Sequence, residues 1–311
     1  MRILITGIDG QDGSILAEKH LSKGDEVWGS VSPRHMTSRV GIDLINAPLE
    51  SIQESNEVFD EIKPERIYHL AAKHLSSTNK ALMNVGLMNE MRTCHVQITQ
   101  NILEWQLSNP ACKSLIALSS QMYTPSTGTT IINEQSRCEP QNYYGETKLE
   151  AMKLLQFYRR NFHVKTYGAI LFNHTSTRSR PDFLFPYLAK QIAQVIKGTS
   201  TEILLKNPNT LIDICHADEV CEGLYKLLNH ESSCDVIFCS GKLVSITDII
   251  SSTLKMLNFQ GIYTVTKTDS QHGSQESLIG DPSLAAKLIN WEVKLKPEEI
   301  MIEQVLQAVN F

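Results

Sequence analysis

The sequence predicts an α/β fold: a doubly wound parallel sheet with helices on both faces, and a smaller C-terminal lobe. Apolar runs alternate with helical patterns over the first two-thirds of the chain, and a glycine-rich turn follows the first run. The alternation loosens after about Asn173. Strands that alternate with helices form parallel sheets. We therefore assign residues 1–172 to the sheet domain and residues 173–311 mainly to the second lobe, with some segments returning to the sheet.

The predicted elements follow one another without an internal repeat or a long linker. Short apolar runs indicate strands, and helical spacing of apolar residues indicates helices. The predicted strands are Arg2–Thr6, Glu26–Ser30, Arg66–Leu70, Ser114–Ser119 and Lys165–Phe172. The predicted helices are Ser14–Ser22, Ile52–Ile62, Glu90–Leu107 and Tyr144–Arg160. Loops of the second lobe are marked by Pro181, Pro186, Pro208 and Pro282.

Composition narrows the class of protein. Of the 311 residues, 41% are hydrophobic and 20% charged, which is typical of a globular domain. A net charge of −5 disfavours a nucleic-acid partner. We find no secretory leader and no apolar run of the ~18 residues that cross a membrane, and expect a cytoplasmic protein. The seven cysteines are expected to be reduced, and the cluster Cys215, His216 and Cys221 lacks a second ligand pair, so no metal is expected.

A glycine turn follows the first strand as Gly7-Ile8-Asp9-Gly10-Gln11-Asp12-Gly13. In this position Gly7 allows a tight turn, Gly10 lets the backbone approach a pyrophosphate, and Gly13 lets the helix pack on the strand. The phosphates then bind at the helix N-terminus. The turn predicts a Rossmann-type dinucleotide site to which Gln11 and Asp12 also contribute.

The end of the second strand indicates which dinucleotide binds. NAD sites usually have an acid here for the ribose hydroxyls. This chain has Gly29-Ser30-Val31-Ser32-Pro33-Arg34-His35, without an acid. The guanidinium of Arg34 suits a 2′-phosphate, with Ser32, Ser38 or Arg39 as helpers. We therefore expect NADP rather than NAD.

Tyr144-Gly145-Glu146-Thr147-Lys148 places a tyrosine and a lysine one helical turn apart. A nearby cation is expected to lower the pKa of the phenol, which then acts as general acid or base on a sugar hydroxyl or carbonyl. Lys148 can also hold the nicotinamide ribose. A serine-rich strand end, Ser119-Ser120, precedes the pair. With the glycine turn, this arrangement resembles the extended short-chain dehydrogenase/reductase superfamily over nearly the whole chain.

Three stretches resemble one branch of that superfamily, the GDP-mannose 4,6-dehydratases. They are the GQDGS at Gly10–Ser14, the ILFNH-x-S-x-R at Ile170–Arg178, and the LIGDPS at Leu278–Ser283 that is followed by Trp291. A sister group, the GDP-4-keto-6-deoxy-mannose reductases, shares the FNH loop and a C-S-G segment like Cys239-Ser240-Gly241.

The resemblance implies residue roles. Ser119 would hydrogen-bond oxygen 4 of the sugar, Tyr144 would be the acid–base, and Lys148 its partner. Asn173 would contact the substrate, or it caps a turn, and Arg178 would reach the nucleotide or diphosphate, or it belongs to a solvated basic patch. We also assign Leu70 and Ala71 to the cofactor and His74 and Ser120 to the substrate.

One departure changes the expected reaction. The dehydratase motif S-T-S-E-L-Y supplies a glutamate that removes the proton from carbon 5, but this chain has Leu118-Ser119-Ser120-Gln121-Met122-Tyr123. A glutamine does not ionise, so direct replacement costs roughly 10²–10⁴ in rate. Two arginines of the family are also absent: Gln271-His272 occupy the region of one, and Ile212 the position of the other.

These observations favour an NADP(H)-dependent enzyme that transfers a hydride at carbon 4 of a probably GDP-linked sugar, as a reductase or epimerase does. Two alternatives stay open. One is a true dehydratase in which Glu146, Glu134, His74 or His95 replaces the missing glutamate, although His95 also fits a core histidine. The other is a dinucleotide-binding protein without turnover. The superfamily further implies a homodimer or homotetramer assembled through the two long helices.

Overall fold

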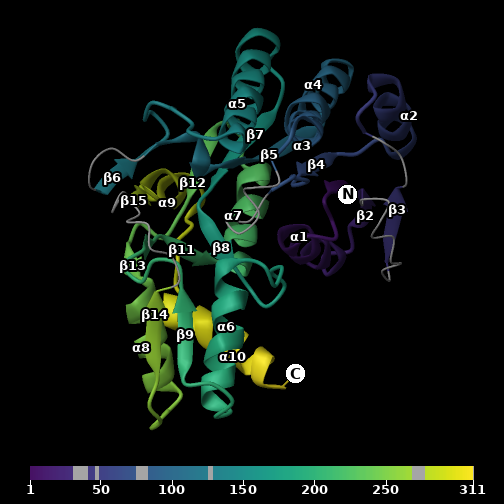
Figure 1. The fold of residues 1–311 in the computed structure, drawn as a ribbon. Coiled ribbons are helices and arrows are strands. Elements are labelled where there is room, and N and C mark those ends of the chain that lie inside the picture. The colour runs from purple at the N-terminus through teal and green to yellow at the C-terminus, as the bar shows by residue number, and fades with distance from the viewer. Residues whose placement is uncertain (31–40, 46–48, 75–82, 125–128, 268–276, 311) are drawn as a thin grey trace.

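The computed structural model describes residues 1–30, 41–45, 49–74, 83–124, 129–267 and 277–310. In this part of the chain the central sheet has seven parallel strands in the order β12-β7-β5-β4-β1-β2-β3 (Figure 1). The strands are β1 (Arg2–Thr6), β2 (Glu26–Ser30), β3 (Ile42–Ile45), β4 (Arg66–His69), β5 (Lys113–Ser119), β7 (Thr166–Leu171) and β12 (Asp235–Phe238). The prediction of an α/β fold with a parallel sheet is confirmed.

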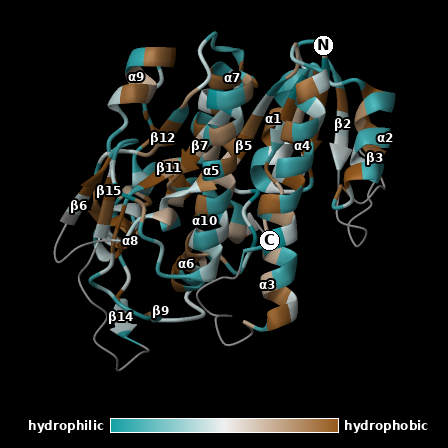
Figure 2. Ribbon diagram, turned by 90° about the horizontal axis from the view of Figure 1, so that it is seen from above, coloured by the Kyte–Doolittle hydropathy of each residue, from teal (hydrophilic) through white to brown (hydrophobic). Residues whose placement is uncertain are grey.

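Both faces of the sheet are covered by helices. Because successive side chains of a strand point to opposite faces, Ile3 and Ile5 belong to one buried cluster and Leu4 to another. The first cluster includes residues of α1 (Gln11–Leu21) and α7 (Ala217–Asn229). The second is covered by α2 (Ile52–Ile62), α4 (Ile98–Ser108) and α5 (Tyr143–Phe162). Figure 2 shows hydrophobic residues along β5, β7 and β12, whereas the helices carry hydrophobic and hydrophilic residues.

Two differences from the predicted elements have physical causes. The strand β3 was not predicted, because its four residues form an edge strand that is only partly buried and shows no apolar run. The predicted helix Glu90–Leu107 begins earlier, at Val85, and consists of α3 (Val85–Arg92), a π-helical turn (Thr93–Gln97) and α4. One period of 3.6 residues does not describe both halves of such a helix.

The second lobe has its own buried cluster. It is formed by α6 (Leu184–Ile196), α8 (Ile246–Met256) and α10 (Pro297–Asn310) with the paired strands β9 (Glu202–Leu205) and β14 (Thr264–Lys267). These elements lie together below the sheet in Figure 1. The strand β12 follows residue 172 in the chain but pairs with β7 in the main sheet. The domain boundary at residue 172 stays a prediction.

Smaller elements connect the two parts. The short parallel pairs are β6 (Thr129–Ile132) with β15 (Ser277–Gly280) and β8 (Asn173–Thr175) with β11 (Ile214–His216). The strands β10 (Leu211–Ile212) and β13 (Val244–Ser245) pair antiparallel, and α9 (Ser283–Ile289) follows β15. The loop after β8 contacts the start of α1, where the Ser176 hydroxyl donates to the Gln11 side chain.

The structure shows the state of the cysteines, and its described part bears on metal sites and membrane-spanning helices. All seven cysteines are free thiols. Within the group of Cys215, His216 and Cys221, the His216 side chain caps α7 and binds the Glu303 carboxylate through Nε2 at 2.8 Å. Among the described residues, no group of three His, Cys, Asp or Glu side chains is arranged to hold a metal. None of the described helices is long and apolar enough to cross a membrane.

Candidate active site

The glycine turn joins three elements of the sheet. Gly7 has a φ of +71°, a conformation that glycine adopts without strain. Its N–H donates to the Ser30 carbonyl at 3.0 Å, and a Cβ on Gly7 would lie 2.9 Å from Cα of Ala71. A Cβ on Gly13 would overlap the carbonyl oxygen of Gly7. The turn therefore holds the ends of β1, β2 and β4 close to the start of α1.

The start of α1 fits the pyrophosphate of a dinucleotide. Gly10 precedes the helix and has no side chain with which to cap it. Amide groups of a first helical turn that lack a capping side chain are donors for an anion. A hollow of about 530 Å³ adjoins the turn, and its lining residues are Asp9, Gly10, Ser14, Glu18, Leu21, Ile42 and Arg178. The hollow and the uncapped helix start leave room for a pyrophosphate here, and the cofactor contacts of Gly7, Gly10 and Gly13 stay predictions.

The side chains of Gln11 and Asp12 bind β8 and the loop that follows it. His174 donates from Nδ1 to the Phe172 carbonyl at 2.8 Å, and its Nε2 lies 2.9 Å from Oδ2 of Asp12. Burial opposes the charged ring, but the Asp12 carboxylate outweighs burial and raises the pKa of His174 to about 9. Gln11 accepts from the Ser176 hydroxyl at 3.0 Å. The cofactor turn and the loop predicted to bind substrate are thus joined by an ion pair.

Arg178 lies against α1. It binds the Glu18 carboxylate with Nη1 at 2.8 Å and Nη2 at 2.6 Å, and Nη1 is 3.2 Å from Oγ of Ser14. This places the guanidinium at the rim of the hollow beside the glycine turn. Asn173 is exposed and donates from Nδ2 to the Asp213 carbonyl at 3.2 Å. Substrate contacts of Arg178 and Asn173 stay predictions.

The start of α5 is pressed against the end of β5. The Asn142 side chain caps the helix by accepting from the N–H of Gly145 at 2.9 Å. A Cβ on Gly145 would overlap the carbonyl oxygen of Gln121, in the short helical turn Ser120–Met122 that follows β5. Glycine is therefore needed after Tyr144, because only it allows the tyrosine to approach this turn.

Tyr144, Ser119 and Lys148 come together at this point. The Ser119 hydroxyl hydrogen-bonds the phenol of Tyr144. Lys148 is buried, its Nζ lies 5.7 Å from the centre of the Tyr144 ring, and it donates to the Ala117 carbonyl at 2.8 Å. The structure thus assembles the three predicted hydride-transfer residues, and their catalytic roles stay predictions.

The expected effect of Lys148 on the phenol is wrong for this arrangement. Burial of Tyr144 raises its pKa above the ordinary value, and only the hydrogen bond from Ser119 acts in the opposite direction. Burial also lowers the pKa of Lys148 to about 8. The sequence pattern predicts that the two residues are neighbours but contains no measure of their desolvation, which here raises the pKa of Tyr144 and lowers that of Lys148. At neutral pH the phenol is protonated and is a proton donor.

Two imidazoles flank the Tyr144 ring edge to face. The His74 ring centre lies 4.9 Å away and the His95 ring centre 5.1 Å away, both at 86° to the phenol. His95 accepts from the Lys73 N–H at 3.1 Å and bonds the Thr147 hydroxyl at 2.8 Å. Its interpretation as a core histidine with satisfied nitrogens fits these contacts.

Two contacts of His69 were not predicted from the sequence, and one predicted cofactor contact lies outside the described residues. His69 bonds the Thr6 hydroxyl at 2.7 Å and donates to the Cys94 carbonyl of the π-helical turn at 2.9 Å. No spacing rule predicts such a contact between a strand end and a helix 25 residues later. The predicted NADP contact Arg34, with Ser32, Ser38 and Arg39, lies outside the described residues.

Buried histidines predict a maximum of stability near pH 6.5. Burial lowers the pKa of His69 to about 3 and that of His95 further. Below pH 6.5 these two rings therefore bind protons in the unfolded chain but stay neutral in the native state. Each ring should remove about 1.4 kcal/mol of unfolding free energy per pH unit there. Protonated His174 stabilises the native state because its pKa is raised there. This contribution is complete below pH 6.5 and is lost as the pH rises to about 9.

Urea unfolding at half-unit steps from pH 4.5 to 9 checks this prediction. The variant His174→Asn should flatten the alkaline side of the curve. A wild-type curve that is flat from pH 5 to 9 would contradict it.

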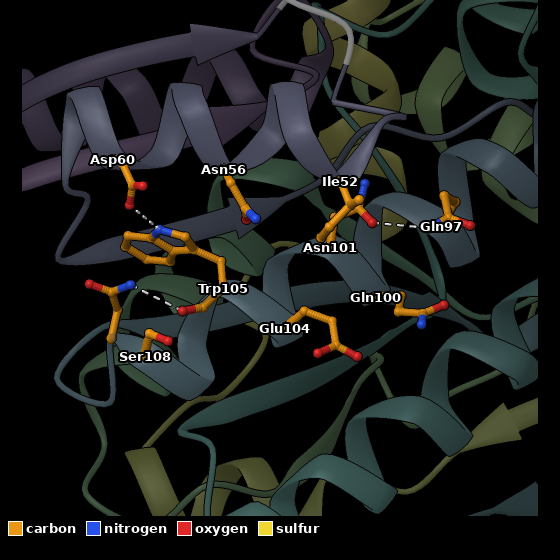
Figure 3. A pocket seen from close by; sticks show the side chains of 10 residues that line it. Ile52, Asn56, Asp60, Gln97, Gln100, Asn101, Glu104, Trp105 and Ser108 are labelled. Atoms are coloured by element: carbon orange, nitrogen blue, oxygen red, sulfur yellow. Dashed lines mark hydrogen bonds between the residues drawn. The ribbon is translucent and has the colours of Figure 1, made fainter.

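A second hollow lies between α2 and α4, away from the catalytic group. It has a volume of about 500 Å³ (Figure 3). The Trp105 indole donates to the Asp60 carboxylate at 2.8 Å, and Gln97 donates to Asn101 at 2.9 Å. None of the predicted site residues lines this hollow, so we assign it no part in the chemistry.

Comparisons with known proteins agree with the geometry. The family model described as GDP-mannose 4,6 dehydratase matches residues 4–304. The chain is 24% identical to GDP-mannose 4,6 dehydratase 2 of Caenorhabditis elegans, covering 98% of this chain and 88% of that protein. It is 25% identical to a GDP-mannose 4,6-dehydratase of Sordaria araneosa, covering 98% of this chain but spanning only 60% of that longer protein.

Solved structures share the fold. A putative epimerase of Burkholderia cenocepacia has a TM-score of 0.83 at 20% identity and covers 100% of this chain and 98% of its own. The protein RMD of Pseudomonas aeruginosa, complexed with NADPH, has a TM-score of 0.76 at 16% identity and covers 100% of both chains. A dTDP-glucose 4,6-dehydratase of Bacillus anthracis, in complex with NAD, has a TM-score of 0.79 at 14% identity and covers 98% of this chain and 96% of its own.

The fold, the glycine turn and the Ser–Tyr–Lys group define an NAD(P)-dependent enzyme of the extended short-chain dehydrogenase/reductase superfamily. Within it, the chain belongs to the GDP-mannose 4,6-dehydratase family, a family of nucleotide-sugar-modifying enzymes.

Proposed function

We propose that this protein transfers a hydride between NADP(H) and carbon 4 of a GDP-linked hexose or deoxyhexose, as a 4-keto reductase or an epimerase does. One observation carries the proposal. The phenol of Tyr144 has Ser119 and Lys148 beside it. Gln121 occupies the position at which the family has an ionisable acid. Hydride transfer at carbon 4 needs only the assembled group.

The assembled residues suit the reduction direction. When bound, the cofactor supplies the hydride for carbon 4. The phenol of Tyr144 is held protonated by its raised pKa, so it can donate a proton to oxygen 4 as that oxygen becomes an alkoxide. Ser119 hydrogen-bonds the same oxygen. Lys148, whose Nζ lies 5.7 Å from the ring centre, would hold the nicotinamide ribose.

The cofactor preference rests on the end of β2. This strand ends at Ser30 without an acid, and the Ser30 carbonyl accepts the N–H of Gly7. Ser30, the last described residue before the segment that contains Arg34, therefore lies beside the glycine turn. Arg34 would bind the 2′-phosphate of NADP. Leu70 and Ala71, whose backbone packs against Gly7, would line the cofactor from the other side.

Mass spectrometry of the purified protein with GDP-mannose, and then with GDP-4-keto-6-deoxy-mannose, tests the function, each with and without NADPH. We expect no change of GDP-mannose and oxidation of NADPH by the 4-keto sugar. Loss of one water from GDP-mannose without net cofactor use would identify a dehydratase instead. Tight cofactor binding with no turnover of either sugar would indicate a binding protein.

We also infer that the protein forms a homodimer or homotetramer through α4 and α5. Phe157 and Phe162 on α5 are 48% and 50% exposed and contact each other at 5.8 Å between ring centres. Leu107 on α4 is 41% exposed. Exposed apolar residues of this size on two adjacent helices are typical of an interface. Light scattering during gel filtration would show a mass at least twice that of the chain, and a monomer would contradict the inference.

A further inference from the structure

The loop after β8 carries two arginines that lie in different parts of the site. Arg178 turns toward α1, where Glu18 binds its guanidinium at 2.8 and 2.6 Å. It also contacts the Ser14 hydroxyl at 3.2 Å. Arg180 instead lies on the Phe183 ring, with its guanidinium carbon 4.6 Å from the ring centre. Arg178 therefore belongs to the hollow beside the glycine turn, and Arg180 does not.

A row of three rings connects Arg180 to the catalytic phenol. Phe183 packs on His74 at 5.5 Å between ring centres, and His74 meets the Tyr144 ring at 4.9 Å. The amide of Gln121 donates to Nε2 of His74 at 3.3 Å and holds the imidazole in this row. Burial and then the Arg180 cation lower the pKa of His74 to about 4. The charge of Arg180 thus acts on the ring that contacts Tyr144.

The carboxylate beside Arg180 is a weak partner. Asp182 lies 3.3 Å from Nε and 3.4 Å from Nη2 of the guanidinium, whereas charge-assisted bonds are typically ~2.7–2.9 Å. The two side chains are 54% and 38% exposed, so solvent screens their attraction. The cation–π contact with Phe183 holds the guanidinium more firmly than this pair does. An entering anion can therefore replace Asp182 with shorter bonds.

The chain lacks cations that its family uses in nucleotide-sugar recognition. Ile212 occupies the position of one family arginine and is an aliphatic residue of β10. The position of the other, at Gln271-His272, lies outside the described residues and holds no arginine. A diphosphate needs a cation or several donors when it leaves water. The family pattern ILFNH-x-S-x-R includes Arg178 but ends before Arg180, so Arg180 is a cation that the pattern does not predict.

The place of Arg180 fits the far end of a sugar whose oxygen 4 lies at Tyr144. Carbon 1 is opposite carbon 4 in a six-membered sugar ring, and the diphosphate is attached to carbon 1. The substrate therefore carries its charge one sugar ring away from the phenol. Arg180 is separated from Tyr144 by the His74 and Phe183 rings, so it lies away from oxygen 4 but on the same side of the site.

We infer that Arg180, rather than Arg178, binds the diphosphate of the substrate, an inference that rests on the nucleotide-sugar class in the proposed function. The guanidinium donates to phosphate oxygens, which its planar fork fits, and gives up the long contacts with Asp182. Phe183 keeps the guanidinium against the row of rings. Arg180 thus selects for a charged group at carbon 1 and takes no part in hydride transfer.

Calorimetric titration of the NADPH-saturated protein with GDP, and separately with UDP, tests this contact without turnover. NADPH fills the cofactor site, so either nucleotide binds at the substrate site. We expect Arg180→Gln to weaken the tighter-binding nucleotide at least about tenfold, because charge-assisted hydrogen bonds are lost. The difference from the wild type should shrink between about 0.05 and 0.5 M NaCl, because salt screens an exposed ion pair. A neutral structural role would not depend on salt.

Two variants with the same change of charge serve as comparisons. Arg178→Gln alters the neighbouring arginine of the loop, and Arg160→Gln alters an exposed arginine of α5. Arg160 follows Tyr144 by sixteen residues on that helix and is therefore about 24 Å away. Both variants should bind the nucleotide within about threefold of the wild type. Because Arg180 is exposed, Arg180→Gln should keep the wild-type melting temperature.

The outcomes separate this inference from the proposed reductase. Wild-type nucleotide affinity in Arg180→Gln, or a loss that appears in Arg178→Gln instead, would overturn the inference. A wild-type protein that binds neither GDP nor UDP would overturn it as well. If Arg180→Gln loses nucleotide affinity but the wild type oxidises no NADPH with the 4-keto sugar, the reductase is overturned and the role of Arg180 stands.

Discussion

Tyr144→Phe is expected to lower kcat about 10²- to 10⁴-fold, because it removes the proton donor to oxygen 4 and leaves the ring in place. The phenylalanine ring keeps the edge-to-face contacts with His74 and His95, which lie 4.9 and 5.1 Å from the tyrosine ring centre. A buried hydroxyl is lost without a change in packing, so folding should be preserved.

Steady-state NADPH oxidation with the 4-keto sugar, together with a fluorescence titration of NADPH, measures this effect. The cofactor Kd should change less than tenfold. Tyr143→Phe is the matched control, because Tyr143 precedes Tyr144 at the start of the same helix and is only half-buried. Activity of Tyr144→Phe within tenfold of the wild type would rule out the phenol as the acid.

Gly13→Ala is expected to abolish cofactor binding and to destabilise the protein. The added methyl would overlap the Gly7 carbonyl oxygen and lie 2.7 Å from Cα of Ile8, and both are backbone atoms that cannot rotate away. Overpacking of this kind typically costs about 1–3 kcal/mol. The start of α1 would move away from the turn, and the donors for the pyrophosphate would move with it.

The melting temperature and the NADPH titration check this prediction. Gly86→Ala is the control, because Gly86 is an exposed position of α3 where alanine favours the helix. The added Cβ would lie 3.2 Å from Oδ1 of Asn84, a side chain that can shift, so this variant should be close to neutral and should leave NADPH binding unchanged. Wild-type affinity in Gly13→Ala would show that the pyrophosphate does not use this helix start.

The sequence predicted those features that depend on local rules. Glycine spacing after a strand marks the turn at Gly7, and the spacing of Tyr144 and Lys148 on a helix places both at one site. Contacts across the fold have no such rule. The edge-to-face contact of His74 with Tyr144 and the ion pair of Asp12 with His174 depend on which strand ends meet, and only the three-dimensional fold determines that.

The π-helical turn Thr93–Gln97 has a consequence for exchanging segments between relatives. It contains an extra residue relative to an α-helical turn, so the faces of α3 and α4 are rotated against each other. His69 holds the turn through the Cys94 carbonyl, and His95 accepts the Lys73 N–H. A chimaera that receives this helix from a relative would therefore need the chain between His69 and Lys73 from the same parent. A deletion of one residue within the turn would rotate α3 by about 100° around the helix axis relative to α4.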